Sequence, residues 1–71
     1  MNARVRVEEA ALGSQRWGVF IERPGSIIGR TLWERYATQA EALAGAEAAT
    51  AYLVDRGELP PETPQFHLKS T

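Results

Sequence analysis

Residues of types that could carry out catalysis occur in this 71-residue chain, but their spacing gives them little support for it. A serine nucleophile needs a base within hydrogen-bond reach, and the single histidine, His67, lies in a tail delimited by prolines, so no serine has an oriented partner. Glu8 and Glu9 are adjacent in an extended segment, so they point to opposite faces and form no acid–base pair. The segment GSIIGRT at 25–31 lacks the lysine of a phosphate-binding loop and predicts a turn. The sequence therefore predicts a protein that is not an enzyme.

Composition also bears on cofactors and location. The chain has no cysteine and one histidine, which excludes the usual structural zinc sets, so we expect neither a metal nor another cofactor. The first ten residues, MNARVRVEEA, contain no apolar run of signal-peptide length, and no stretch approaches the ~20 apolar residues of a membrane span. We expect a cytoplasmic protein that does not associate with membranes. A chain this short buries only a small core, so we expect it to gain stability from a protein partner or by forming a homodimer.

Three segments have the patterns of β-strands. RVRV at 4–7 alternates strictly between arginine and valine, which predicts a half-buried strand near 3–11. RWGVFIE at 16–22 is rich in aromatic and β-branched residues and predicts a strand near 16–23. RPGS at 23–26 supplies the proline and glycine of a tight turn, and GRTLWERY then resumes an extended pattern, which predicts a strand near 28–36.

A helix is predicted from about 38 to 56. Thr38 and Glu41 have the spacing of a capping box, and Gly57 has the position of a terminating glycine. ELPPETP at 58–64 cannot continue a helix, and QFHLK at 65–69 has room for a short edge strand. We predict an α+β protein, with a three-stranded antiparallel sheet packed on one long C-terminal helix. Residues 1–57 form this domain, and residues 58–71 form an extended proline-rich tail.

The helix is predicted to pack closely because its inward side chains are small. Its expected buried stripe is Ala42, Ala46, Ala49 and Leu53, flanked by Leu43 and Thr50. The inward face of the second strand carries larger groups, namely Trp17, Val19 and Ile21. Large side chains from the sheet therefore fill the space that the alanines leave.

The other face of the sheet is where we predict binding. A large apolar group must lie there, because the third strand exposes either Trp33 or both Leu32 and Tyr36. We expect aromatic rings and arginines that suit a protein or nucleic-acid surface, or a face covered by the tail through Phe66. The predicted outer face is Arg4, Arg6, Glu8, Phe20, Glu22, Trp33 and Arg35. Its candidate partner-binding residues are Arg4, Arg6, Phe20, Trp33 and Arg35.

Charge distribution favours a protein partner over nucleic acid. Residues 1–36 hold six arginines and four glutamates, whereas residues 37–71 hold two basic and five acidic residues. The formal net charge of −1 lacks the large basic excess on which phosphate binding depends. We expect a non-enzymatic protein-binding module, of the kind found among phage or plasmid regulators and inhibitors. The alternative is a nucleic-acid-binding module that uses the outer face of the sheet.

Two resemblances accompany this prediction. The run TQAEALAGAEAATAYL followed by DRGELPP resembles the helix and proline exit of HicB-type antitoxins. That resemblance implies a partial ribonuclease-H-like sheet and helix that bind and block a small toxin ribonuclease, often as a dimer. The inserted segment IIGRTLWERYA departs from the pattern of that family.

The second resemblance is to a small bacterial family of unknown function and to integrase arm-binding domains. It rests on Trp17, Tyr36, Thr38, Glu41 and Ala42. In the integrase domains the sheet lies in a DNA groove. The resemblance therefore implies DNA-contacting roles for the following arginines: Arg4, Arg6, Arg16 and Arg35.

Overall fold

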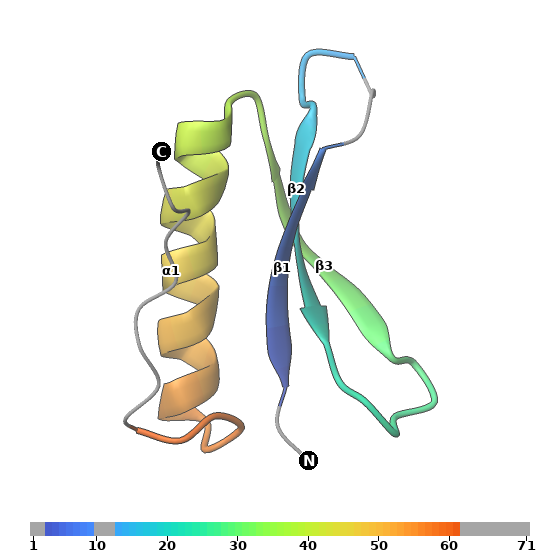
Figure 1. The fold of residues 1–71 in the computed structure, drawn as a ribbon, viewed down its shortest axis with the longest axis vertical. Coiled ribbons are helices and arrows are strands. Elements are labelled where there is room, and N and C mark those ends of the chain that lie inside the picture. The colour runs from blue at the N-terminus through green and yellow to red at the C-terminus, as the bar shows by residue number, and fades with distance from the viewer. Residues whose placement is uncertain (1–2, 10–12, 62–71) are drawn as a thin grey trace.

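The computed structural model describes residues 3–9 and 13–61, which form two layers, one a sheet and the other a helix (Figure 1). The sheet is antiparallel with strand order β1-β2-β3, and this arrangement confirms the predicted α+β fold. The possible edge strand at 65–69 and the end of the predicted tail lie outside the described residues. The elements are β1 (Arg4–Glu9), β2 (Trp17–Glu22), β3 (Arg30–Tyr36) and α1 (Gln39–Asp55).

The turn between β2 and β3 is closed by backbone hydrogen bonds. The Arg23 N–H donates to the Gly29 carbonyl at 2.7 Å, and the Ser26 N–H donates to the Arg23 carbonyl at 3.1 Å. Gly25 and Gly29 have φ values of 85° and 74°, a region that side chains other than glycine rarely adopt. The glycines of the predicted turn therefore let the chain reverse direction here.

The helix begins at the predicted cap. The Glu41 backbone N–H donates to the Thr38 hydroxyl, and the Thr38 backbone N–H donates to the Glu41 carboxylate, each at 3.2 Å. This reciprocal pair satisfies two of the N–H groups that a helix start leaves without partners. After the last turn, Gly57 adopts a φ of 80° and its N–H donates to the Val54 carbonyl at 3.0 Å.

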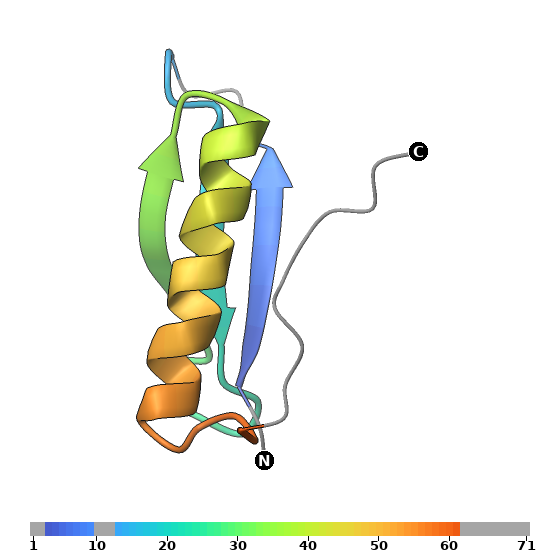
Figure 2. The ribbon, with the colours of Figure 1, turned by 90° about the vertical axis from the view of Figure 1, so that its left-hand side faces the viewer.

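The core lies between α1 and the middle of the sheet. Figure 2 shows α1 running along the sheet in front of β2, with β1 and β3 on either side. The helix residues of the predicted stripe are buried, and Val19 and Ile21 from β2 face them. Trp17 is half-buried at the edge of this core. In the part of the chain that the structure describes, no helix is long and apolar enough to cross a membrane.

One contact in the core depends on a glycine inside the helix. Gly45 is buried, and a Cβ atom at this position would lie 2.2 Å from the Tyr36 hydroxyl oxygen. The tyrosine ring therefore rests directly on the helix backbone. The pKa of Tyr36 is raised, first by burial and then by the charge of Glu34, while a hydrogen bond from Trp33 acts in the opposite direction.

A β-bulge in β3 reverses the predicted orientation of Trp33. Val19 lies opposite Glu34 while Phe20 lies opposite Leu32, so Trp33 is an extra residue in β3. With strict alternation from Tyr36, Trp33 would point to the outer face. The bulge shifts the alternation by one residue, so Trp33 points to the helix side instead. The indole packs against the core, 5.3 Å from the ring centre of Tyr52. The prediction that Trp33 lies on the outer face is therefore wrong.

Glu58 joins the end of the helix to the sheet. Its carboxylate accepts hydrogen bonds from Nε of Arg23 at 2.7 Å and Nε of Arg56 at 3.0 Å. The bonds from Arg23 and then from Arg56 lower the pKa of Glu58 to about 2. Leu59, the next residue, packs against the core. Residues 58 and 59 thus hold the base of the β2–β3 turn against the C-terminus of α1.

Candidate functional site

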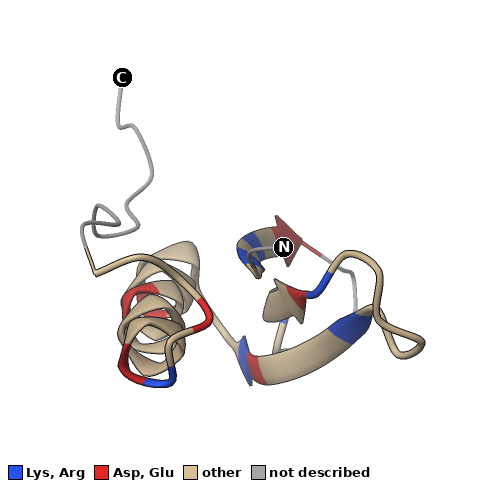
Figure 3. Ribbon diagram, turned by 90° about the horizontal axis from the view of Figure 1, so that it is seen from below, with Lys and Arg blue, Asp and Glu red and all other residues tan. Residues whose placement is uncertain are grey.

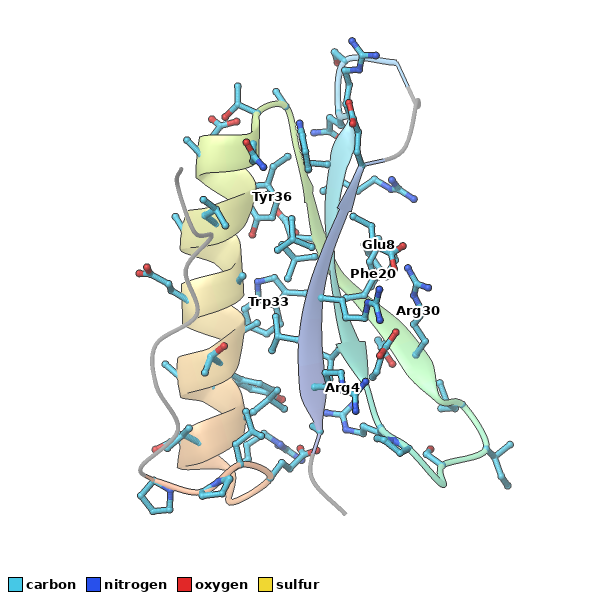
Figure 4. The ribbon with its side chains drawn as sticks, in the orientation of Figure 1. Arg4, Glu8, Phe20, Arg30, Trp33 and Tyr36 are labelled. Atoms are coloured by element: carbon cyan, nitrogen blue, oxygen red, sulfur yellow. The ribbon has the colours of Figure 1, made fainter. Side chains whose placement is uncertain are left out.

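The candidate site is the face of the sheet that points away from the helix, called here the outer sheet face. Directly opposed residues of neighbouring strands share a face, so the registers define its members. In Figure 4 the labelled Arg4, Glu8, Phe20 and Arg30 lie on this side, whereas Trp33 and Tyr36 lie between sheet and helix. The outer sheet face consists of Arg4, Arg6, Glu8, Gly18, Phe20, Glu22, Arg30, Leu32 and Arg35.

Phe20 lies at the centre of this face and is covered on one side. Its ring packs over Gly18, where an added Cβ would lie 2.8 Å from a ring carbon. This contact buries Gly18 although it is on the outer side of the sheet. The guanidinium of Arg30 stacks over the Phe20 ring at 4.0 Å from its centre, a cation–π arrangement. Phe20 is therefore only half-exposed, and its ring is held in one orientation.

Ion pairs surround the phenylalanine. Nε of Arg6 lies 3.5 Å from a Glu8 oxygen and 3.7 Å from a Glu22 oxygen, and Arg30 donates to the other Glu8 oxygen. These pairs are partly exposed, and such pairs contribute little stability each. Their effect on the site is to fix the positions of Arg6 and Arg30 beside the ring.

Two arginines of the outer sheet face remain without an ion pair. Arg4 lies across from Glu22 and Arg35 lies across from Gly18, and neither forms a salt bridge with any described residue. The Nη1 atom of Arg35 is buried without a hydrogen-bond partner among the described residues. With four arginines against two glutamates, this face carries an excess of two positive charges.

Leu32 takes the outer position that was predicted for Trp33. It lies directly opposite Phe20 and is 44% exposed. Because of the bulge, the apolar part of the site is a phenylalanine–leucine pair and not a phenylalanine–tryptophan pair. Sequence reasoning identified Arg4, Arg6, Phe20 and Arg35 as members of this face. It missed Arg30, and it placed Leu32 on this face only in the alternative that also exposed Tyr36. The positions of Arg30 and Leu32 follow from the register shift.

The β2–β3 turn carries the most exposed apolar residues of the described chain. Ile27 is fully exposed, and Ile28 is 77% exposed. The Arg30 N–H donates to the Ile28 carbonyl at 2.8 Å where the loop enters β3. The sequence predicted a turn here but did not indicate that both isoleucines would be exposed.

Opposite charge gathers on the other side of the molecule. Glu41, Glu47 and Asp55 are exposed on α1, and most of the charged positions on the helix in Figure 3 are acidic. The outer sheet face therefore carries a local excess of positive charge, which the acidic residues elsewhere in the chain offset in the net charge of −1. Within residues 3–9 and 13–61, no group of three or more histidine, cysteine, aspartate or glutamate side chains could hold a metal ion.

The arrangement is suited to noncovalent recognition. Its parts are an apolar pair at the centre, arginines that stack on it or form ion pairs around it, and two arginines that form no ion pair with a described residue.

Comparison with known proteins identifies no relative: no family model, no curated protein and no solved structure matches this chain.

Proposed function

We propose that this chain is a small, non-enzymatic binding module that recognises a protein partner through the outer sheet face. The observation that carries the proposal is the Phe20–Leu32 pair at the centre of a face that no described residue covers. Interfaces take most of their energy from a few well-packed residues near their centre, and charged residues at the rim set orientation and rate. A module of this size would regulate or inhibit its partner by covering part of the partner's surface.

The chemistry of the partner follows from the charges on this face. Arg4 and Arg35 form no ion pair with any described residue, so carboxylates of a partner can pair with them, and the face as a whole has a positive excess. A matching surface presents carboxylates around an apolar patch. Arginine pairs with carboxylates through two parallel hydrogen bonds, so such contacts also fix the orientation of the partner.

A nucleic-acid partner is the second candidate, and the four arginines on one face favour it. Phosphates bind arginine by the same two-pronged geometry, and an aromatic ring such as Phe20 can stack on a base. Glu8 and Glu22 lie among these arginines and already pair with Arg6. A sugar–phosphate backbone is negatively charged along its whole length, so where it crosses the face it would be repelled by both carboxylates. A protein surface can place its carboxylates opposite Arg4 and Arg35 alone, and we therefore place the nucleic-acid candidate second.

Affinity capture with matched variants tests the proposal. The wild-type chain and a Leu32→Ser variant are immobilised and exposed to a lysate of the cells that produce the protein, once with and once without nuclease treatment. The control is Ile28→Ser, which also removes an exposed apolar side chain but lies in the β2–β3 turn. We expect one protein that wild type and the control capture equally and Leu32→Ser does not. Equal capture by all three would contradict the proposal, and capture that nuclease abolishes would favour the second candidate.

A further inference from the structure

The free edge of β1 is a second surface without a partner. β1 pairs with β2 on one side, and no described strand lies on the other. At its start the Ala3 N–H donates to the Glu58 carbonyl at 3.4 Å, so the free edge runs from Arg4 to Glu9. Such an edge offers backbone donors and acceptors to any strand that can lie beside it.

The sequence of β1 is complementary to itself in the antiparallel direction. It reads RVRVEE, with both arginines in its first half and both glutamates at its end. When two copies of the strand run antiparallel, the basic half of each lies opposite the acidic half of the other. A parallel pair would place arginine beside arginine and is disfavoured.

We propose that two copies of this chain associate through antiparallel pairing of their β1 strands, which gives a six-stranded sheet with two helices on one face. The other edge of the sheet is less suited to this role, because the bulge at Trp33 interrupts the regular backbone pattern of β3. The pairing does not involve the partner proposed for the outer sheet face, and the two proposals stand or fall separately.

Side-chain orientation and charge select one register. Even-numbered residues of β1 lie on the outer sheet face, and odd-numbered residues face the helix. In a continuous sheet, each even-numbered residue of one copy must therefore lie opposite an even-numbered residue of the other. A two-fold axis at Arg6 would bring two arginines face to face and would also use Ala3, whose N–H is already donated to Glu58. An axis at Val7 places Arg6 opposite Glu8 of the partner subunit. The register centred on Val7 is therefore favoured.

The helix-facing side of β1 supports the same pairing. Val5 and Val7 pack against the core but are only half-buried, because α1 lies over the middle of the sheet and not over its β1 edge (Figure 2). In the favoured register the two Val7 side chains lie side by side and cover each other. The pairing thus combines backbone hydrogen bonds, an apolar contact and two pairs of opposite charges.

Single cysteines test both the pairing and its register, since the chain has no cysteine of its own. Directly opposed residues have Cα atoms about 4.5–5.5 Å apart, which a disulfide can bridge. Val7→Cys should therefore form a covalent dimer under mild oxidation. Val5→Cys is the matched control, because the two Val5 positions are offset by four residues, roughly 14 Å, in this register. Equal cross-linking of the two variants would contradict the register.

Sedimentation of the unmodified chain tests the association without any substitution. We expect the mass to rise with concentration from 7.8 kDa toward twice that value. Arg6→Glu should weaken dimerisation roughly tenfold, because it turns two pairs of opposite charge into pairs of like charge. Adding Glu8→Arg to it should restore the opposite charges and the dimer. A chain that stays at the monomer mass at every concentration would overturn the proposal. In that monomer, protection from hydrogen exchange at the β1 amides that point away from β2 would instead indicate that another segment of the same chain pairs with the edge.

Discussion

Gly45→Ala should destabilise this protein, although the same substitution stabilises most helices. Gly45 lies inside α1, where alanine is normally better than glycine by about 1 kcal/mol. A Cβ atom here would lie 2.2 Å from the hydroxyl oxygen of Tyr36 and 2.4 Å from its Cζ atom. The tyrosine ring must therefore move off the helix, and it loses the burial that raises its pKa.

The magnitude follows from two opposing terms. Forcing an extra methyl group into a packed site costs about 1–3 kcal/mol, and the helix preference for alanine offsets about 1 kcal/mol of that. We expect a net loss of roughly 0–2 kcal/mol. In a Tyr36→Leu background the atoms that would collide are absent, so Gly45→Ala should stabilise by about 1 kcal/mol. The coupling between the two positions is then about 1–3 kcal/mol, because the helix preference cancels in the cycle.

Urea unfolding of the four proteins measures this coupling, with tryptophan fluorescence as the signal. Thermal unfolding gives an independent value, since 1 kcal/mol shifts the melting temperature of so small a domain by about 4–8 °C. Ala48→Gly, at an exposed site of the same helix, is the control and should cost about 1 kcal/mol. If Gly45→Ala stabilises the wild-type and Tyr36→Leu backgrounds equally, Tyr36 does not rest on the helix at Gly45.

Three further predictions concern stability. Thr38→Ala removes the hydroxyl that accepts the Glu41 N–H and should cost about 1 kcal/mol in thermal unfolding; no change would mean that the helix does not depend on this cap. Glu58 has a pKa lowered to about 2, so it stabilises the fold fully above the ordinary glutamate pKa, and this stabilisation is lost as pH falls through 2. Glu58→Gln should remove that part of the acid dependence in pH-dependent unfolding, whereas exposed Glu47→Gln should leave it unchanged. Trp33→Ala should lower the melting temperature because the indole packs on the core, and an unchanged value would place it back on the outer face.

The helix and strands could be predicted because each has a local cause. The alternation RVRV sets the faces of β1, and Thr38 with Glu41 sets the start of α1 through a capping box that the structure contains. The buried alanine stripe follows from three- and four-residue spacing along the helix. These patterns depend on neighbours within a few residues, so the sequence alone carries them.

The site was predicted less completely because its geometry depends on pairing between strands. No residue in GRTLWERY signals a bulge, yet one extra residue moves Trp33 inward and Leu32 outward. Arg30 reaches Phe20 only because the register places both near the same position of the sheet. The link from Glu58 to Arg23 joins residues 35 positions apart. Gly45 was likewise missed, because its role depends on a tyrosine from a different element.

The most direct test of the binding proposal is the salt dependence of affinity for the captured partner, measured for wild type, Leu32→Ser and an Arg4→Gln, Arg35→Gln double variant. An interface centred on Phe20 and Leu32 predicts that the dissociation constant changes little between low and moderate salt. It also predicts that Leu32→Ser weakens binding more than the loss of both arginines. Residues at the centre of an interface contribute most of its energy, and the registers place Leu32 beside Phe20 in the middle of the face and both arginines in its outer rows. A steep loss of affinity with salt, a slope that flattens by about one unit for each arginine removed, and a mild effect of Leu32→Ser would contradict a protein interface and support binding to phosphates.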